Sequence, residues 1–270
     1  MMATLFSSSM GCDASRPSRL RALSTPGWLL MFDPVAIDAV VFDIGGVFLV
    51  PHPDPVREAL ASINVALGDD DAFHRAHYGG VHAVSALDIP ETDPAFWRHY
   101  VLAYLREIGV RDDQAESCLV AWASLYNQPV QVTWRWPQQH NIDALARFVV
   151  ASMPIAIVSN NDGTAPEQMR SFGVCQVGDG PFHSVAAIVD SGTVGVAKPD
   201  PAIFTPALEA LGTVASRTLY VGDMVHADVR GAEAAGMPVV QIDPYRLHES
   251  FAHARVPHLD ALADLLFGAA

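Results

Sequence analysis

The sequence predicts an α/β protein: a doubly wound, parallel, Rossmann-like sheet forms the core, and an α-helical cap is inserted after the first strand. Short apolar runs, typical of strands buried on both faces, lie at 39–42, 155–158, 219–221 and 239–242. Helical patterns that alternate with these runs indicate the crossovers of a parallel sheet. The stretch 52–140 differs, because its apolar residues recur only at helical spacing and no strand run interrupts them.

These patterns divide the 270 residues into three parts. The core is expected at 31–51 and 141–270, and the helical cap at 52–140, where it would act as a lid over the site. Residues 1–30 are rich in Ser and lack periodicity, so we interpret them as a disordered extension or as sequence upstream of a true start at Met31.

Composition restricts the partners and the compartment. The 16 basic and 30 acidic residues give a net charge of −14, which repels nucleic acid and anionic membranes. No apolar run reaches the roughly 18 residues of a membrane span. The 3 cysteines form no CxxC pair, which disfavours a disulfide scaffold or a cysteine-rich zinc site and favours the cytoplasm. We therefore expect a small-molecule partner, and the oligomeric state is not predicted.

Polar side chains follow three of the predicted strands. Asp43, Ser159 with Asn160, and Asp223 each stand where an apolar run ends. Because ligands of such sheets bind beyond the carboxyl ends of the strands, these side chains are expected to meet. Asp43 could serve as a nucleophile or a metal ligand, and Ser159 and Asn160 could hydrogen-bond an oxyanion. The alternative is that each merely begins a turn.

Lys198 is the only lysine among the 16 basic residues. Asp200 is a good helix N-cap and Pro201 suits the first helical position, so Lys198 precedes a helix N-terminus. Positive potential gathers there, and an ammonium group in that place suits a phosphate. A solvated surface lysine is the alternative. Pro206 falls inside the predicted helix, and nothing in the sequence explains it.

Two carboxylates stand five residues apart after the third strand. Asp223 ends the strand, and Asp228 falls near the start of the next helix. Paired carboxylates suit a hard cation such as Mg²⁺, which prefers oxygen ligands. Alternatively, Asp228 simply caps its helix.

Taken in order, these stretches resemble the motifs of the haloacid dehalogenase superfamily over residues 39–242. The resemblance rests on Val-Val-Phe-Asp43-Ile-Gly45-Gly, Ile-Val-Ser159-Asn160, Gly-Val-Ala-Lys198-Pro-Asp-Pro, and Val-Gly-Asp223 through Asp228 to Gly231-Ala232 and Ala235-Gly236. The helical insert is similar to that family's cap. Most members are magnesium-dependent phosphatases, so the resemblance implies Mg²⁺-dependent hydrolysis of a small phosphorylated metabolite.

The resemblance also implies roles for single residues. Asp43 would attack phosphorus and form an aspartyl-phosphate. Ser159 and Asn160 would bind the phosphoryl group, and Lys198 would neutralise charge on the nucleophile and the phosphate. The substrate itself is not predicted.

A metal shell is implied in the same way. Asp43, Asp223 and the carbonyl oxygen of Gly45 would hold Mg²⁺, and Asp228 would support that shell by hydrogen bonding.

Gly45 departs from the family pattern, because the family's phosphatases usually carry a second Asp there as general acid. Such an acid is typically worth about 10²–10⁴-fold in rate. The alternatives are a slower phosphatase, a donor from elsewhere (His52, Asp54 or a metal-bound water), a 2-haloacid dehalogenase, or a phosphate-binding protein without catalysis. Dehalogenases also lack the acid, but they usually have an aromatic residue at that position.

The remaining candidates are expected to be structural. The segment Trp134–Pro137 is expected to pack where the insert rejoins the core, with pocket lining as the alternative. Trp97, Tyr100 and Tyr104 are expected in the cap core, and His226 on a loop surface rather than as a ligand.

Overall fold

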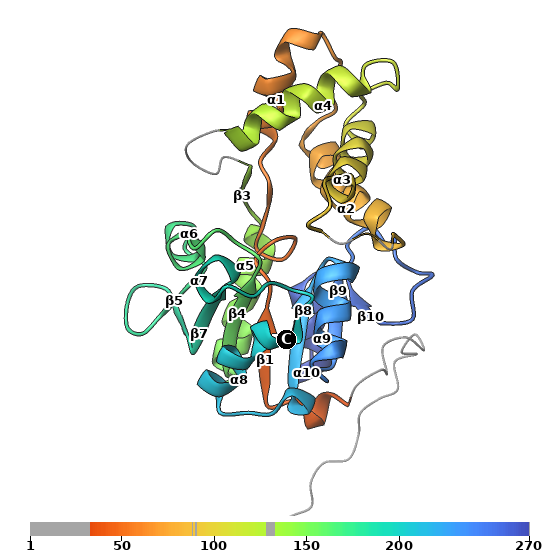
Figure 1. Cartoon of the computed structure of the whole chain (residues 1–270). Coiled ribbons are helices and arrows are strands. Elements are labelled where there is room, and N and C mark those ends of the chain that lie inside the picture. Colours follow the sequence, from red (N-terminus) through yellow and green to blue (C-terminus); the bar gives the residue numbers. More distant parts are fainter. Residues whose placement is uncertain (1–32, 88, 90, 128–132, 270) are drawn as a thin grey trace, which may run out of the picture.

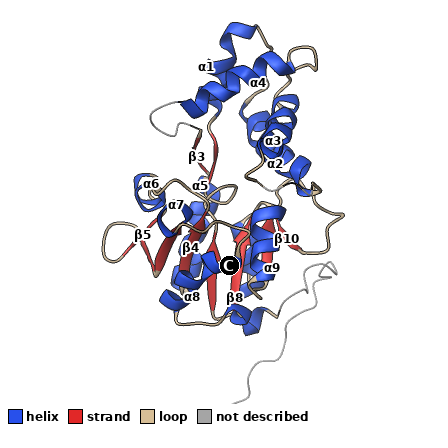
Figure 2. Cartoon of the chain, in the orientation of Figure 1, coloured by secondary structure: helices blue, strands red, loops and turns tan. Residues whose placement is uncertain are grey.

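The computed structural model describes residues 33–87, 89, 91–127 and 133–269, so the prediction for residues 1–30 lies outside the described residues. Its core is a six-stranded, wholly parallel sheet with the order β10-β9-β8-β1-β4-β7 (Figures 1 and 2). The strands are β1 (Ala39–Phe42), β4 (Ile155–Ser159), β7 (Ala187–Asp190), β8 (Thr218–Gly222), β9 (Val239–Ile242) and β10 (Ala254–Val256). The α/β class is therefore confirmed; β7 and β10 were not predicted.

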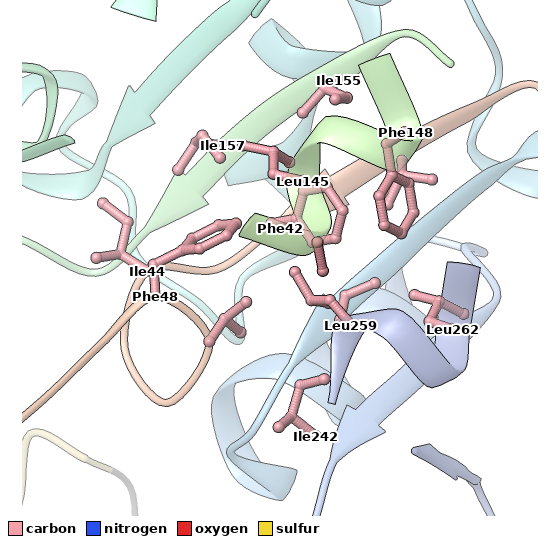
Figure 3. Close-up of a cluster of buried hydrophobic side chains, with 14 of the residues drawn as sticks. Phe42, Ile44, Phe48, Leu145, Phe148, Ile155, Ile157, Ile242, Leu259 and Leu262 are labelled. Atoms are coloured by element: carbon pink, nitrogen blue, oxygen red, sulfur yellow. The ribbon is translucent and has the colours of Figure 1, made fainter. Parts of the chain in front are cut away.

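Helices cover both faces of the sheet, and successive side chains of β1 point to opposite faces. Val40 and Phe42 belong to the cluster on one face, and Val41 belongs to the cluster on the other. Figure 3 shows the first cluster, in which Phe42 packs among side chains of α5 (Gln139–Val150) and α10 (Leu259–Phe267). The ring of Phe42 meets that of Phe148 edge-on at 5.2 Å. This packing fixes β1, and with it the loop that carries Asp43.

The opposite face is covered by α8 (Thr205–Leu211) and α9 (Arg230–Ala234). A 3-10 turn, Pro201–Phe204, precedes α8, and the side chain of Asp200 accepts from the amide of Ala202 as its N-cap. The predicted helix is thus two pieces, and Pro206 lies in the first turn of the second. A proline there loses no helical hydrogen bond, which explains its presence.

In the described part of the chain, four α-helices lie between β2 (Leu49–Pro51) and β3 (Trp134–Pro137) and form a second body above the sheet (Figure 1). They are α1 (Pro53–Leu60), α2 (Asp70–Ser85), α3 (Pro94–Glu107) and α4 (Ala115–Ala123). A separate cluster of buried side chains holds them together, with Tyr100, Tyr104 and Trp122 at most 2% exposed.

The expectation of helices alone up to residue 140 is wrong. Strand β3 (Trp134–Pro137) pairs antiparallel with β2 (Leu49–Pro51) where the chain enters and leaves the cap. The amide of His52 also donates to the carbonyl of Thr133 at 2.7 Å. Only half-buried and interrupted by Arg135, β3 is no apolar run, and it forms because a distant segment offers hydrogen-bond partners.

The smaller elements complete the chain. Short helices lie at Pro34–Ala36, Ala61–Ile63, Ser124–Asn127, Ala165–Ser171 (α6), Ser191–Val194 (α7), Ala215–Arg217 and Val225–Val229, and β5 (Cys175–Val177) pairs with β6 (His183–Val185). Within the described ranges, no helix is long and apolar enough to cross a membrane.

Candidate active site

The carboxyl ends of β1, β4 and β8 open into a cavity of about 660 Å³ beneath the cap. Core and cap both line it. All seven residues singled out in the sequence meet there: Asp43, Gly45, Ser159, Asn160, Lys198, Asp223 and Asp228. The strand-end rule predicted this meeting for Asp43, Ser159, Asn160 and Asp223, and the roles of all seven residues stay predictions.

Lys198 lies at the centre of the buried charges. Its Nζ is 2.8 Å from Oδ1 of Asp43 and 2.7 Å from Oδ1 of Asp228, and it donates to the hydroxyl of Tyr220 at 2.9 Å. Burial opposes its charge, but Asp228 and Asp43 outweigh burial and raise the pKa of Lys198 above its usual value. Lys198 is therefore a permanent cation beside Asp43 and is not a surface lysine.

Asp228 links the lysine to the loop after β8. Its Oδ2 accepts from the main-chain amides of Asp223 and Met224 at 3.0 and 2.8 Å, while Oδ1 accepts from Lys198 and Tyr220. One carboxylate thus fixes both the lysine ammonium group and the backbone that carries Asp223.

Asn160 supports the lysine from the other side. Its Oδ1 accepts from the amide of Lys198 at 2.8 Å, and its Nδ2 donates to the carbonyl of the same residue at 3.0 Å. The side chain is therefore engaged with the main chain at Lys198, although Asn160 also lines the cavity.

Three buried carboxylates face a single ammonium group. Ligand oxygens of Asp43, Asp223 and Asp228 all lie within 4.8 Å of one another. Burial raises the pKa of Asp43 to about 7, with Lys198 opposing and Asp228 adding to the rise; burial and Asp228 raise the pKa of Asp223. The raised pKa values show that Lys198 alone does not balance three carboxylates, and the hard oxygen atoms of this cluster fit Mg²⁺.

The cap reaches into this cluster through His77, which the sequence analysis missed. Its Nε2 is 2.8 Å from Oδ2 of Asp223, and its Nδ1 is 2.9 Å from the hydroxyl of Tyr100. Burial lowers the pKa of His77 to about 3, so the ring is neutral. Because a carboxylate accepts, we assign the proton to Nε2, which donates to Asp223 and leaves Nδ1 to accept from the hydroxyl of Tyr100. The neighbouring Tyr78 donates to the carbonyl of Gly46 at 2.9 Å. Only the docking of α2 on the core reveals these contacts.

The two glycines after Asp43 have different surroundings. A Cβ on Gly45 would lie 3.5 Å from Cζ3 of Trp134, so the indole ring stands against the position of the missing acid. Gly46 has a φ of 63°, and a Cβ there would lie 2.1 Å from Cγ of Asp223. Gly46 is therefore required for the close approach of this loop to Asp223.

Two structural expectations need correction. His226 is only 9% exposed, because the turn at Val225–Val229 carries it beneath the cap, where its ring meets that of Phe96 edge-on at 5.8 Å. Trp134 lines the cavity, whereas Trp136 packs against the cap cluster as expected. Trp97 packs against the cap cluster as expected, and it also lines the cavity.

The proposed substitute acids lie elsewhere. His52 caps α1 and accepts from the amide of Asp54 at 3.2 Å. Neither residue is among the described residues that line the cavity.

The fold and the site define a haloacid dehalogenase-like hydrolase. The family model described as "haloacid dehalogenase-like hydrolase" matches residues 37–236. The chain belongs to this family and is an enzyme of the hydrolase class.

Several relatives are named as phosphatases. The chain is 27% identical over 203 residues to a phosphoglycolate phosphatase of Pseudomonas savastanoi pv. phaseolicola, covering 75% of this chain and 68% of the relative. It is 32% identical over 145 residues to a glyceraldehyde 3-phosphate phosphatase of Methanopyrus kandleri (54% and 58%). A phosphoserine phosphatase of Thermus thermophilus is 43% identical over 67 residues (25% and 27%). The chain thus spans about three fifths of the length of the Methanopyrus relative and about a quarter of the length of the Thermus relative.

Solved structures show the same fold. The HAD-hydrolase YfnB of Bacillus subtilis, described as bound to magnesium, has a TM-score of 0.53 at 19% identity and covers 86% of this chain and 99% of its own. A HAD phosphatase of Thermococcus onnurineus has a TM-score of 0.51 at 18% identity, with the same coverage of 86% and 99%.

Proposed function

We propose that this chain is an Mg²⁺-dependent phosphatase that hydrolyses phosphomonoesters of small molecules through a phosphorylated Asp43. One observation carries the proposal: Nζ of Lys198 is 2.8 Å from Asp43 and 2.7 Å from Asp228 inside a cavity that also holds Asp223. A nucleophile, a fixed cation and a hard-cation site in one enclosure suit transfer of a phosphoryl group. The phosphatases among the relatives support the same reaction class.

Asp43 performs the bond exchange. A carboxylate oxygen of Asp43 forms a bond to phosphorus while the bond from phosphorus to the ester oxygen of the substrate breaks, and the leaving alkoxide takes a proton from water. Water then attacks the phosphorus of the aspartyl-phosphate, which releases inorganic phosphate and restores the carboxylate. Because Asp43 is only 7% exposed, the cavity limits the water that reaches it.

Neighbouring groups stabilise the transferring charge. Lys198 places its ammonium group beside Asp43, and Ser159, 4% exposed at the end of β4, offers a hydroxyl to a phosphoryl oxygen. Mg²⁺, held by Asp43, Asp223 and the carbonyl oxygen of Gly45, would neutralise further charge on the phosphoryl group. Asp228 holds Lys198 and the main chain at Asp223 in place.

The direct test is hydrolysis of p-nitrophenyl phosphate with and without Mg²⁺. We expect turnover only with the metal, and we expect Asp43→Asn to abolish it, because an amide is nearly isosteric but is no nucleophile. Asp54→Asn, which changes an exposed carboxylate of the cap, is the matched control and should retain activity. An active Asp43→Asn variant, or full activity in EDTA, would contradict the proposal.

A 2-haloacid dehalogenase is the second candidate, and Trp134 is the observation that favours it. The indole ring against Gly45 supplies an aromatic surface next to the nucleophile. Halide release from 2-haloacids without metal would support this candidate, whereas the paired carboxylates favour the phosphatase. If neither hydrolysis nor halide release is detected but the protein binds phosphate, it is a phosphate-binding protein without catalysis.

A further inference from the structure

The part of the cavity beyond the phosphate site has an unusual distribution of charge. Among the described residues that line the cavity, Lys198 is the only basic one, and Asp43 and Asp228 already neutralise it. Two further acids line the cavity outside the cluster of Asp43, Asp223 and Asp228: Glu91 from the cap and Asp162 from the core. A leaving group with its own carboxylate or phosphate would therefore find no described cation to pair with.

Glu91 is the most distinctive of these groups. Its side chain is 15% exposed, and its Oε1 is buried with no hydrogen-bond partner among the described residues. Its Oε2 accepts from Nδ2 of Asn160 at 3.4 Å. Asn160 directly follows Ser159 in the sequence, so this contact brings Glu91 close to the proposed phosphate site. Nδ1 of His226 lies 3.9 Å from Oε1, beyond hydrogen-bond distance, and that nitrogen also has no hydrogen-bond partner among the described residues. A buried carboxylate oxygen without a donor is costly unless a ligand supplies the donor.

Aromatic side chains line the same cavity as Glu91. Trp97 of α3 and Trp134 of β3 line the same cavity, together with the apolar Met224 and Pro94. A cavity that offers both a carboxylate and indole rings suits an ammonium group, which can form a charge-assisted hydrogen bond with the carboxylate and be attracted to a ring face.

We propose that the preferred substrates are phosphorylated amino alcohols, and that Glu91 receives their ammonium group. This specificity rests on the proposed phosphatase function. It differs from that of the relative named as a phosphoglycolate phosphatase, because glycolate brings a carboxylate into the region where this chain has Glu91 and Asp162.

The test compares esters that differ mainly in the charge of the alcohol. Phosphates of ethanolamine and 3-aminopropanol are measured against those of glycolate and 3-hydroxypropanoate, with 1-propyl phosphate as the uncharged alkyl reference. We expect kcat/KM to be about 10- to 100-fold higher for the amines, the range of one charge-assisted hydrogen bond. Equal rates, or a preference for the carboxylates, would overturn the proposal.

Variants assign the preference to a residue. Glu91→Gln should reduce the ratio of amine to carboxylate kcat/KM about tenfold or more, because the amide keeps the shape but loses the charge. Glu58→Gln, an exposed carboxylate on α1, should leave the ratio unchanged. A Glu91→Gln ratio equal to that of the wild type would remove Glu91 from the proposal.

Binding keeps this inference separate from the proposed function. Inactive Asp43→Asn protein is titrated calorimetrically with the same esters, and tighter binding of the amines is expected whether or not the wild type turns over. If p-nitrophenyl phosphate is hydrolysed but the amines are neither preferred nor bound more tightly, the specificity fails and the phosphatase stands. If no ester is hydrolysed but the amines bind more tightly, the proposed phosphatase function fails and the specificity for amines stands.

Discussion

Gly46→Ala is expected to destabilise the protein and disturb the site, whereas its neighbour Gly45→Ala is expected to do neither. At a φ of 63°, an L-residue at position 46 costs roughly 1–2 kcal/mol. The new Cβ would lie 2.1 Å from Cγ of Asp223, so that carboxyl group must move and lose its 2.8 Å hydrogen bond with His77. A buried group left without its partner costs about 1–3 kcal/mol more.

The sum predicts a loss of about 2–5 kcal/mol in the free energy of unfolding for Gly46→Ala. At about 2–4 °C per kcal/mol for a chain of this size, Tm should fall by roughly 4–20 °C. A Cβ at Gly45 meets Trp134 at 3.5 Å, an ordinary contact, and its φ lies outside the left-handed region. Gly45→Ala should therefore change stability by no more than about 1 kcal/mol.

Thermal unfolding followed by circular dichroism measures both variants beside the wild type. A Mg²⁺ titration of p-nitrophenyl phosphate hydrolysis reports the site, and Gly46→Ala should need a higher Mg²⁺ concentration. An unchanged Tm for Gly46→Ala, or an equal loss in Gly45→Ala, would refute the steric argument.

Three further predictions follow from the site. Lys198→Arg should lower kcat at least 100-fold, because the planar guanidinium is broader than the ammonium group it replaces at 2% exposure; near-normal kinetics would make the lone lysine incidental. His77→Leu should raise the Mg²⁺ concentration for half-maximal rate about 10- to 100-fold, and His77→Gln, which keeps a donor, should restore most of it; an unchanged Mg²⁺ titration would contradict this positioning role. Because Gly45 has no side-chain acid, kcat/KM for aryl phosphates should exceed that for alkyl phosphates by about 10²–10⁴-fold. Gly45→Asp should narrow that gap, and a wild type indifferent to the leaving group would show that another residue supplies the proton.

The core and the part of the candidate site at the strand ends were predictable because their signals are local. Asp43, Ser159 and Asp223 each follow an apolar run, and the geometry of a parallel sheet brings the ends of such runs together. Lys198 was distinguished by being the only lysine. Its ammonium group indeed lies between two carboxylates.

The cap side of the site was not predictable, because it depends on contacts between distant segments. His77 lies 146 positions from its partner Asp223, and nothing near it in the sequence marks it as a site residue. Glu91 acquires its place only when the cap docks on Asn160. Trp134 was interpreted as packing, and the pairing of β3 with β2 turns it toward the cavity instead.

Detection of phosphorylated Asp43 is the measurement that tests the central claim most directly. The enzyme is mixed with p-nitrophenyl phosphate and Mg²⁺, quenched in acid within the first turnover, and analysed by intact-mass and peptide mass spectrometry. Our account predicts the added mass of one phosphoryl group on the peptide that contains Asp43, absent in Asp43→Asn and absent from wild type mixed in EDTA. Full turnover with an unmodified Asp43 peptide, or the phosphoryl group on another residue, would contradict it.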